Sequence, residues 1–524
     1  MLGRREFLGG AAALATYGAA AAERSLRLRV FDASGAPAAA ELVKSLLLID
    51  AAGRPFELLP RAGAGGLIEI GVPDGKFEIV MTLPVREFGQ VYLFADNGGP
   101  LYTAAAAQGE LLLNHEFARS RAACVRRYIE VGRQEGIVFD AAVTGRLERG
   151  ESHLQAATAA HEPDVKVRLS NASLAETMWA GENAALQRAR QRIARRGVRQ
   201  GFLFGCNAFG FAGSENYARR YTELFNFATV PFYRKAAEKI EGSIDNSIVD
   251  SLLAKMAGSS LLLKGHPLIW MHQAGMPEFL KAKSYDQQKE SCRRYILERV
   301  GRYRTRIHAW DVINEAHDWA NDLHLDPEQL IEMTRLGAMS AREADPTAFR
   351  LVNNCCIGGE YVVRRRSYSG PLGRRARSPY EYLEALEAAR VPYEAIGIQA
   401  YYDELNRDML EIERLLKRFY RFGKPIHITE QGLPSSNEPA PGNEVEFPTP
   451  NVWHGTTWNE QIQADWVEQF YTLCYSQPEI DALSWWDFED PAFIPQGGLL
   501  RKDGTPKQAY TRLKALFAQW RAMA

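Results

Sequence analysis

The chain has 524 residues, 46% of them hydrophobic and 24% charged, and its 63 basic and 64 acidic residues leave a formal net charge of −1. This composition excludes an intrinsically disordered acidic or basic protein. Because the charges balance, the chain has no net positive charge that would attract a polyanion such as a nucleic acid. The sequence contains no zinc-finger spacing or other nucleic-acid-binding motif, so we expect neutral or polar partners and no nucleic acid. The length favours two or three domains.

The N-terminus carries a predicted export signal over residues 1–22. Arg4 and Arg5 precede an alanine-rich stretch that ends in small residues, a pattern similar to twin-arginine signals. We therefore expect a mature chain that begins near Glu23 and lies in the periplasm or outside the cell. The alternative is an ordinary N-terminal helix, which would have little to pack against. No later segment has eighteen consecutive apolar residues, so stable membrane insertion is not expected.

Residues 25–105 predict a β-rich N-terminal domain. Short runs of strand-forming residues are separated by turn signals rich in Gly, Asp and Asn. The predicted strands are residues 26–31, 45–50, 67–72, 77–83 and 90–94. Such spacing is typical of a small sandwich, which we interpret as a carbohydrate-binding or a packing domain.

A helical connecting region is predicted over residues 106–199. Apolar residues at helical spacing indicate helices over residues 111–131 and 182–196. The pattern between residues 140 and 180 is weak, and it predicts neither a structure nor a role for that segment.

From residue 200 to residue 524, eight short apolar runs alternate with stretches of mostly amphipathic helical pattern. The runs are residues 201–205, 225–230, 262–270, 307–314, 349–354, 395–400, 425–430 and 482–488. Repeated β-then-α units of this kind predict an α/β fold, a closed (β/α)8 barrel of the TIM type. The alternative is a doubly wound open sheet, but the first strand-to-helix turn lacks a G-x-G-x-x-G pattern.

Two glutamates fall where such a barrel carries its chemistry, at the carboxyl ends of the strands. Glu315 follows the fourth run and Glu430 ends the seventh, so we expect their carboxyl groups to face each other across the barrel mouth. Glycoside hydrolysis needs such a pair, because one carboxyl group protonates the leaving oxygen while the other attacks the sugar or activates water. For either glutamate alone, an ion pair with an arginine is the alternative.

An amide and several aromatic residues lie beside these glutamates. Asn314 precedes Glu315 and is in a position to hold a sugar hydroxyl. Trp270 and Trp486 fall at or near strand ends, where aromatic rings suit the apolar faces of pyranose sugars, although core packing is the alternative for each. Trp485 and Trp486 point to opposite faces of one strand, so at most one should face the cleft.

Other kinds of catalytic site find little support in the sequence. The pairs His266 with His272 and His317 with His324 lack an H-E-x-x-H or similar metal-binding spacing, so no metal and no cofactor is expected. A G-x-S-x-G elbow is also absent, which leaves an acyl-transfer triad unsupported.

Residues 200 to 520 resemble the glycoside hydrolase family 10 endo-1,4-beta-xylanases. The matching stretches are residues 265–270 (GHPLIW), 310–316 (WDVINEA), 397–399 (GIQ), 428–430 (ITE) and 499–510 (LLRKDGTPKQAY). The resemblance implies a retaining endo-acting hydrolase of β-1,4-xylan, with Glu315 as acid/base and Glu430 as nucleophile. By the same resemblance, the residues that line the sugar subsites are Asn314, His266, Trp270, Gln273, Gln399 and Trp486.

The chain departs from the family pattern beside the second glutamate. The family has a histidine two residues after the glutamine of the sixth strand and an acidic residue two after the nucleophile, and these two form a hydrogen-bonded pair. This chain has Tyr401 and Gly432 at those positions. We expect the Tyr401 hydroxyl to act as a substitute donor to Glu430 and to line the substrate site.

A second departure concerns the distal sugar. The second strand lacks the family's Glu-Asn pair and reads Val-Pro-Phe-Tyr over residues 230–233, while Lys235 is expected at the family's sugar-binding lysine position. We therefore predict a secreted, monomeric xylanase-type enzyme whose distal sugar recognition differs from the family's. Two alternatives stay open: a hydrolase of another β-linked glycan, and a non-catalytic polysaccharide-binding protein, against which the retention of both glutamates argues.

Overall fold

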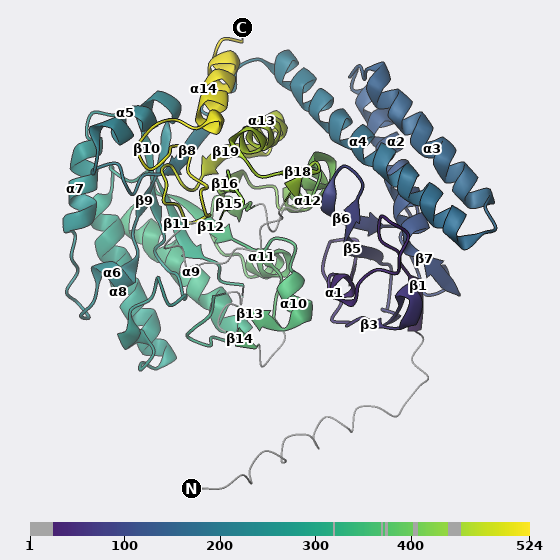
Figure 1. Ribbon diagram of the computed structural model, residues 1–524. Helices are drawn as coiled ribbons and strands as arrows, with labels where there is room; N and C mark the ends of the chain where they lie inside the picture. Colours follow the sequence, from purple (N-terminus) through teal and green to yellow (C-terminus); the bar gives the residue numbers. More distant parts are fainter. Residues whose placement is uncertain are drawn as a thin grey trace, which may run out of the picture.

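The computed structural model describes residues 25–317, 320–367, 370–371, 376–401, 407–438 and 452–523. These residues form a β-rich module, a group of three long helices and a closed barrel, in chain order (Figure 1). The predicted export signal, residues 1–22, lies outside the described residues. In the part of the chain that the structure describes, no helix is long and apolar enough to cross a membrane.

Eight parallel strands close the barrel, in the order β10-β11-β12-β15-β16-β19-β8-β9. Their bounds are β8 Leu203–Asn207, β9 Phe227–Pro231, β10 Leu262–His266, β11 Ala309–Asn314, β12 Phe349–Asn354, β15 Ala395–Gln399, β16 Ile426–Glu430 and β19 Ile480–Trp485. Each falls in or beside one of the eight predicted runs. The predicted (β/α)8 barrel is therefore confirmed, and the closed ring excludes the doubly wound sheet.

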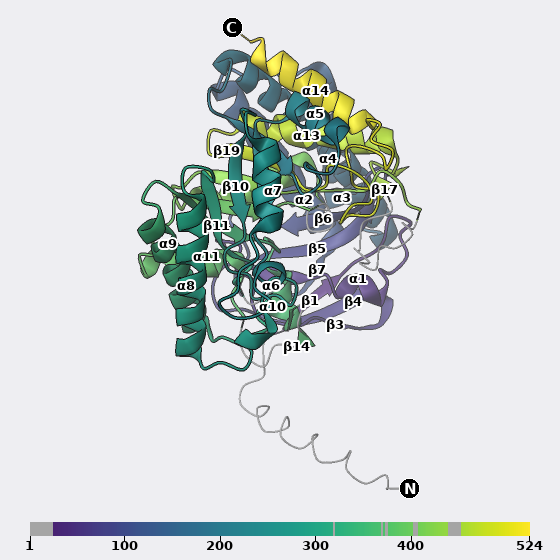
Figure 2. The same ribbon diagram turned by 90° about the vertical axis from the view of Figure 1, so that its left-hand side faces the viewer.

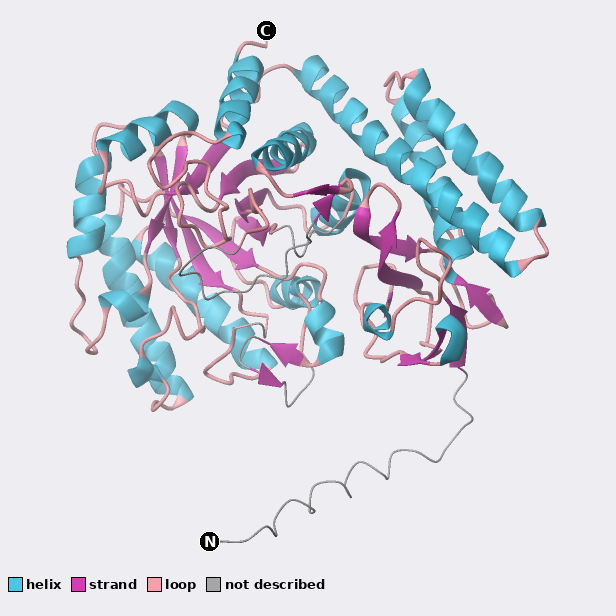
Figure 3. Ribbon diagram, viewed as in Figure 1, coloured by secondary structure: helices cyan, strands magenta, loops and turns pink. Residues whose placement is uncertain are grey.

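Helices enclose the barrel, as Figure 3 shows with cyan helices around magenta strands. Their bounds are α5 Glu215–Leu224, α6 Arg234–Ala237, α7 Ser247–Met256, α8 Tyr285–Tyr303, α9 Pro327–Ala344, α10 Glu360–Arg364, α11 Pro379–Ala388, α12 Met409–Tyr420, α13 Glu460–Ser476 and α14 Gln508–Arg521. Two further pairs of short antiparallel strands are β13 Arg366–Ser367 with β14 Gly370–Pro371 and β17 Val452–Trp453 with β18 Thr456–Thr457. Capping boxes begin α8, α9 and α11, where Ser284, Asp326 and Ser378 satisfy free backbone N–H groups.

Two sheets build the N-terminal module, as the spacing of strand signals predicts. Their strands are β1 Ser25–Arg29, β2 Leu47–Ile49, β3 Arg61–Ala62, β4 Leu67–Gly71, β5 Glu78–Val85, β6 Gly89–Ala95 and β7 Glu110–Leu112, and a short helix, α1, spans Ala40–Val43. One sheet has the order β3-β4-β1-β7 and the other β2-β5-β6. Because β7 pairs with β1, the first sheet extends beyond residue 105, the expected end of this domain.

Three helices fill the connecting region: α2 Leu113–Gln134, α3 Ala141–Ala159 and α4 Pro163–Arg196. The weakly patterned segment between residues 140 and 180 is thus helical. Small residues explain why its apolar pattern is weak, since they let α3 and α4 approach closely. A Cβ atom on Gly150 would lie 2.5 Å from the Thr177 side chain, and Ser170 and Ser173 are fully buried.

The module and the helical group lie on the same side of the barrel (Figures 1 and 2). The β5–β6 sheet packs against α12, where Arg414 lies 3.7 Å from the centre of the Phe94 ring. Buried Glu78 accepts hydrogen bonds from Arg414 (2.8 Å) and Arg418 (2.9 Å). The barrel therefore occupies this face of the sheet, and a carbohydrate site on the module has to lie elsewhere.

Replacing Glu78 with alanine should destabilise the chain, because Arg414 and Arg418 then lack their common counterion in a largely buried interface. We expect a loss of about 3 kcal/mol in the free energy of unfolding. Chemical denaturation measures it. Glu41→Ala is the matched control, since its exposed pair with Lys44 contributes little. Equal stability of the two variants would show that the interface does not depend on Glu78.

Candidate active site

Glu315 and Glu430 both lie at the carboxyl ends of barrel strands. Glu430 is the last residue of β16, and Glu315 directly follows β11. Both side chains are buried, with 7% and 5% of each residue exposed. Glu315 has a φ of +54°, a conformation that residues other than glycine rarely adopt, and its N–H donates to the carbonyl of Asn353 (2.9 Å). The backbone at Glu315 is thus held in a sparsely populated conformation.

Two donors fix the carboxyl group of Glu315. Nε1 of Trp270 donates to Oε2 (2.9 Å), and Nε2 of Gln399 donates to Oε1 (2.8 Å). The Trp270 ring is itself stacked on His272, with 4.5 Å between the ring centroids. The structure therefore brings two predicted subsite residues, Trp270 and Gln399, into direct contact with the predicted acid/base.

Glu430 also accepts two hydrogen bonds. The Tyr401 hydroxyl donates to Oε2 (3.0 Å), and Nδ2 of Asn353 donates to Oε1 (2.9 Å). The expected contact between Tyr401 and Glu430 is thus present. Asn353 was not among the predicted residues, although its position near the carboxyl end of β12 is a signal that could have identified it.

A buried ionic cluster of Asp311 and Lys264 holds His266 beside Glu430. Asp311 accepts a hydrogen bond from Nδ1 of His266 (2.8 Å) and pairs with the ammonium group of Lys264 (2.7 Å). Nε2 of His266 lies 3.9 Å from Oε1 of Glu430. Burial lowers the pKa of His266, which favours the neutral imidazole next to Glu430.

Asn314 links the two halves of the site. Its Oδ1 accepts a hydrogen bond from Nδ2 of Asn353 (2.8 Å), the group that also donates to Glu430. Nε2 of Gln399, which donates to Glu315, lies 3.4 Å from the same oxygen. Glu315 and Glu430 therefore belong to one continuous hydrogen-bond network at one end of the barrel.

The two carboxyl groups influence each other's ionisation. Burial raises the pKa of Glu315, and burial together with the negative charge of Glu315 raises the pKa of Glu430 to about 8. Two interacting carboxyl groups lose their protons in steps that belong to the pair. The pair can therefore hold a single proton near neutral pH, which is the state that a general acid beside a carboxylate requires.

Gly432 lies beside Ile494 and Tyr401. A Cβ atom at position 432 would lie 2.9 Å from Cγ1 of Ile494 and 3.4 Å from Cε1 of Tyr401. Tyr401, Trp486 and Ile494 form one small buried cluster. The two departures from the family pattern are therefore neighbours in space: Ile494 leaves no room for a Cβ atom at position 432, and the tyrosine ring lies in contact with the same position.

We expect Tyr401→Phe to lower kcat/KM about 10-fold or more, because a hydrogen bond to a charged group contributes about 1.5–3 kcal/mol. The Tyr401 hydroxyl lowers the pKa of Glu430, so its removal should shift the pH profile of kcat/KM to higher pH. A pH profile on an aryl β-xyloside measures both effects. Tyr382→Phe, which loses a buried hydroxyl contact to Thr334, is the control; equal profiles for the two variants would contradict the assigned role.

Aromatic rings line the site next to His266. The Trp486 ring lies edge-on to His266 (5.2 Å between centroids) and to Phe209 (5.8 Å). The Tyr233 ring lies 5.8 Å from both His266 and Trp270. Phe209 is 39% exposed, which is unusual for so large an apolar side chain. Neither Phe209 nor Tyr233 was predicted as a site residue, although both lie just beyond strand ends.

The paired tryptophans point in opposite directions, as expected. Trp485 is fully buried and donates a hydrogen bond to the carbonyl of Gly497 (3.0 Å). Trp486 instead packs beside His266 and Tyr401. Only Trp486 is thus placed among the site residues.

Lys235 and Gln273, two further residues of the predicted subsites, contact each other. The Lys235 ammonium group donates to the backbone carbonyl of Gln273 (2.8 Å) and pairs with Glu278 (3.3 Å). The lysine is therefore engaged by the loop that follows β10. Among the described residues, no three His, Cys, Asp or Glu side chains are grouped so that they could hold a metal ion.

Comparisons with known proteins find similarity over the barrel. A family model described as "Glycosyl hydrolase family 10" matches residues 201–515. Endo-1,4-beta-xylanase C of Paenibacillus barcinonensis is 26% identical over 235 residues, which are 40% of this chain and 20% of that protein. Endo-1,4-beta-xylanase B of Thermotoga neapolitana is 22% identical over 280 residues, which are 50% of this chain and 71% of that protein.

A solved structure titled as GH10 from Paenibacillus barcinonensis covers 63% of this chain and 97% of its own, with 20% sequence identity and a TM-score of 0.47. The chain spans between 20% and 35% of the length of three of the curated relatives that it matches.

Proposed function

Because this chain belongs to glycosyl hydrolase family 10, we propose that it is a retaining, endo-acting hydrolase of β-1,4-xylan-type polysaccharide. One observation carries the proposal: Glu315 and Glu430 are buried on a single hydrogen-bond network at the carboxyl end of the barrel. Curated relatives named endo-1,4-beta-xylanase support the choice of substrate.

In the proposed first step, Glu315 protonates the glycosidic oxygen while Glu430 attacks the anomeric carbon and forms a covalent glycosyl-enzyme. Formation of this ester removes the negative charge of Glu430. The pKa of Glu315 then falls, so that the ionised Glu315 can take a proton from the water that releases the product. Two displacements at the same carbon leave its configuration unchanged.

The proposed sugar contacts divide between polar and aromatic groups. Asn314, His266 and Gln399 offer hydrogen-bonding atoms close to the carboxyl pair. Trp486 and Trp270 offer ring faces, which suit the C–H surfaces of a pyranose. Phe209 and Tyr233 add two more aromatic rings beside these tryptophans, just beyond the ends of β8 and β9. Their position favours recognition of the distal sugar by stacking rather than by hydrogen bonds.

The experiment that tests the proposal follows hydrolysis of xylohexaose by proton NMR. We expect internal cleavage and initial release of the β-anomer. Initial release of the α-anomer would contradict retention, and failure to cleave any β-glycan would favour the non-catalytic alternative. A panel of xylan, glucuronoxylan, arabinoxylan, mixed-linkage glucan and aryl xylosides then tests the substrate. Preference for mixed-linkage glucan would favour a hydrolase of another β-linked glycan.

Export through the twin-arginine pathway is a further part of the proposal, supported by the sequence around Arg4 and Arg5. Fractionation of cells that express the full chain tests it. We expect the product in the periplasm or the medium, and we expect the double variant Arg4→Lys/Arg5→Lys to remain in the cytoplasm. Equal export of both chains would contradict this route.

A further inference from the structure

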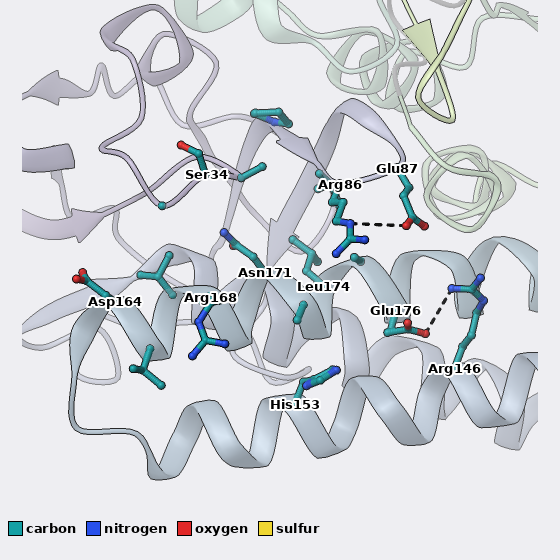
Figure 4. Close-up of a pocket in the computed structure, with 18 residues that line it drawn as sticks. Ser34, Arg86, Glu87, Arg146, His153, Asp164, Arg168, Asn171, Leu174 and Glu176 are labelled. Carbon is teal, nitrogen blue, oxygen red and sulfur yellow. Dashed lines mark hydrogen bonds and ion pairs between the residues drawn. The ribbon is translucent and has the colours of Figure 1, made fainter.

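A cleft lies between the β-rich module and the helices α3 and α4, as Figure 4 shows. Its volume is about 670 Å³, and its lining comes from residues 33 to 176. The catalytic residues come from the barrel, so this cleft is separate from the active site. Ligand sites commonly have volumes of roughly 300–1,000 Å³ and often lie between structural units.

The cleft combines an apolar surface with planar polar side chains. Val85 and Leu174 provide the apolar part. Arg86 reaches the cleft from the turn between β5 and β6, while Arg168 and Asn171 come from α4 (Figure 4). Such a mixture suits a sugar, which presents C–H groups on its ring faces and hydroxyl groups around its edge.

Hydrogen bonds fix the wall of the cleft. Oδ1 of Asn171 accepts from Nδ2 of Asn114 (2.8 Å), and Nδ2 of Asn171 donates to the carbonyl of Asp32 (3.1 Å). The Asp32 side chain stabilises the loop that contains it, because it accepts hydrogen bonds from the N–H groups of Ser34 (2.8 Å) and Ala36 (3.0 Å). The module and α4 are thus joined at the edge of the cleft, and the site is formed before any ligand binds.

Two guanidinium groups in the cleft have spare hydrogen-bonding capacity. Within the described residues, Arg168 makes no ion pair and no side-chain hydrogen bond, and Arg86 only approaches its neighbour Glu87 at 3.7 Å. Glu87 accepts a hydrogen bond from Nε1 of Trp179 (3.1 Å), and Glu176 pairs with Arg149 (2.9 Å). Glu87 and Glu176 thus each have a hydrogen-bond or ion-pair partner other than Arg86 and Arg168.

The charges of the lining select against a strongly charged ligand. Three arginines, at positions 86, 146 and 168, face three acidic residues, at positions 87, 164 and 176, so their formal charges cancel. Donors and acceptors lie together in the cleft, and a hydroxyl group can use both because it donates and accepts at once. A polyanion or a polycation would be repelled by half of these groups.

We propose that this cleft is a second binding site for a neutral, hydroxyl-rich oligosaccharide, contacted by Arg86, Arg168 and Asn171. The inference rests on the proposed function for its choice of ligand, a β-1,4-linked xylo-oligosaccharide. A chain of polysaccharide held there would keep the substrate near the catalytic barrel and raise its local concentration.

Isothermal titration calorimetry of the inactive double variant Glu315→Gln/Glu430→Gln with xylohexaose tests the proposal, because it measures the number of binding sites per chain. We expect two binding sites per chain. Adding Arg86→Ala and Arg168→Ala should leave one site or weaken the second at least 10-fold, because both side chains that offer free donors are removed. Arg133→Ala is the matched control, an exposed arginine of α2 outside the cleft, and two sites should remain. Unfolding temperatures verify that each variant is folded.

The outcomes separate this proposal from the proposed function. One site per chain in the inactive variant, or two sites that persist without Arg86 and Arg168, would overturn the second site even if the wild-type chain hydrolyses xylan. Failure of the wild-type chain to cleave any β-glycan would overturn the proposed function instead. The stoichiometry with xylohexaose still decides the second site in that case, since it requires binding and no turnover.

Discussion

Replacement of Glu430 with alanine is expected to lower kcat/KM on aryl β-xylosides on the order of 10⁴-fold or more. Glu430 is the last residue of β16, and Tyr401 and Asn353 hold its two oxygens. Without this carboxylate, the alanine side chain offers no nucleophile that could form the covalent intermediate. The control is Glu438→Ala, which removes an exposed glutamate from the loop that follows β16 and should keep full activity.

Azide provides a second readout for the same variant. The anion is small enough to enter the space that the missing carboxylate leaves, where it can attack the anomeric carbon of a bound aryl xyloside. A single displacement inverts that carbon, so the expected product is an α-xylosyl azide, which NMR identifies. Retained hydrolysis without azide, or rescue that gives the β-azide, would show that Glu430 is not the nucleophile.

The positions of Glu315 and Glu430 at one rim of the barrel follow from the sequence because they depend on local patterns. A short apolar run marks each strand, and the carboxyl ends of parallel barrel strands meet at one rim. Glu315, Glu430, Gln399 and Tyr401 all lie at or beside such ends, and the structure joins them in one network. Asn353 follows the same rule. Its neighbour Asn354 instead donates a hydrogen bond to the backbone carbonyl of Gly397 (3.0 Å). An asparagine at a strand end is therefore not by itself sufficient to identify a site residue.

The remaining features depend on contacts that leave no local signal. Glu78 meets Arg414 across 336 positions of sequence, so the docking of the module on α12 cannot be inferred from either segment. The helices α3 and α4 pack through Gly150 and other small residues, and this weakens the apolar periodicity on which helix prediction relies. Lys235 has the residue type that the family pattern expects, but its ammonium group is held by Gln273 and Glu278.

The variant Glu315→Ala distinguishes general acid catalysis from a structural role when its kcat/KM is compared on substrates with poor and with good leaving groups. On xylan we expect kcat/KM to fall about 10²–10⁴-fold, because the departing sugar needs a proton. On an aryl xylobioside with an activated leaving group, which departs without protonation, the loss should be much smaller. A similar loss on both substrates would contradict the assignment. Glu328→Ala, an exposed glutamate at the start of α9, is the control.

The pH dependence of the same variant tests the coupling between the two carboxyl groups. Because burial and the charge of Glu315 raise the pKa of Glu430 to about 8, the pair keeps its last proton up to that pH. Wild-type kcat/KM should therefore fall above about pH 8, as the proton needed for the leaving group is lost. In Glu315→Ala the repulsion is absent, so the pKa of Glu430 falls and the basic limb should disappear on activated substrates. A basic limb that persists unchanged would mean that another group supplies this proton.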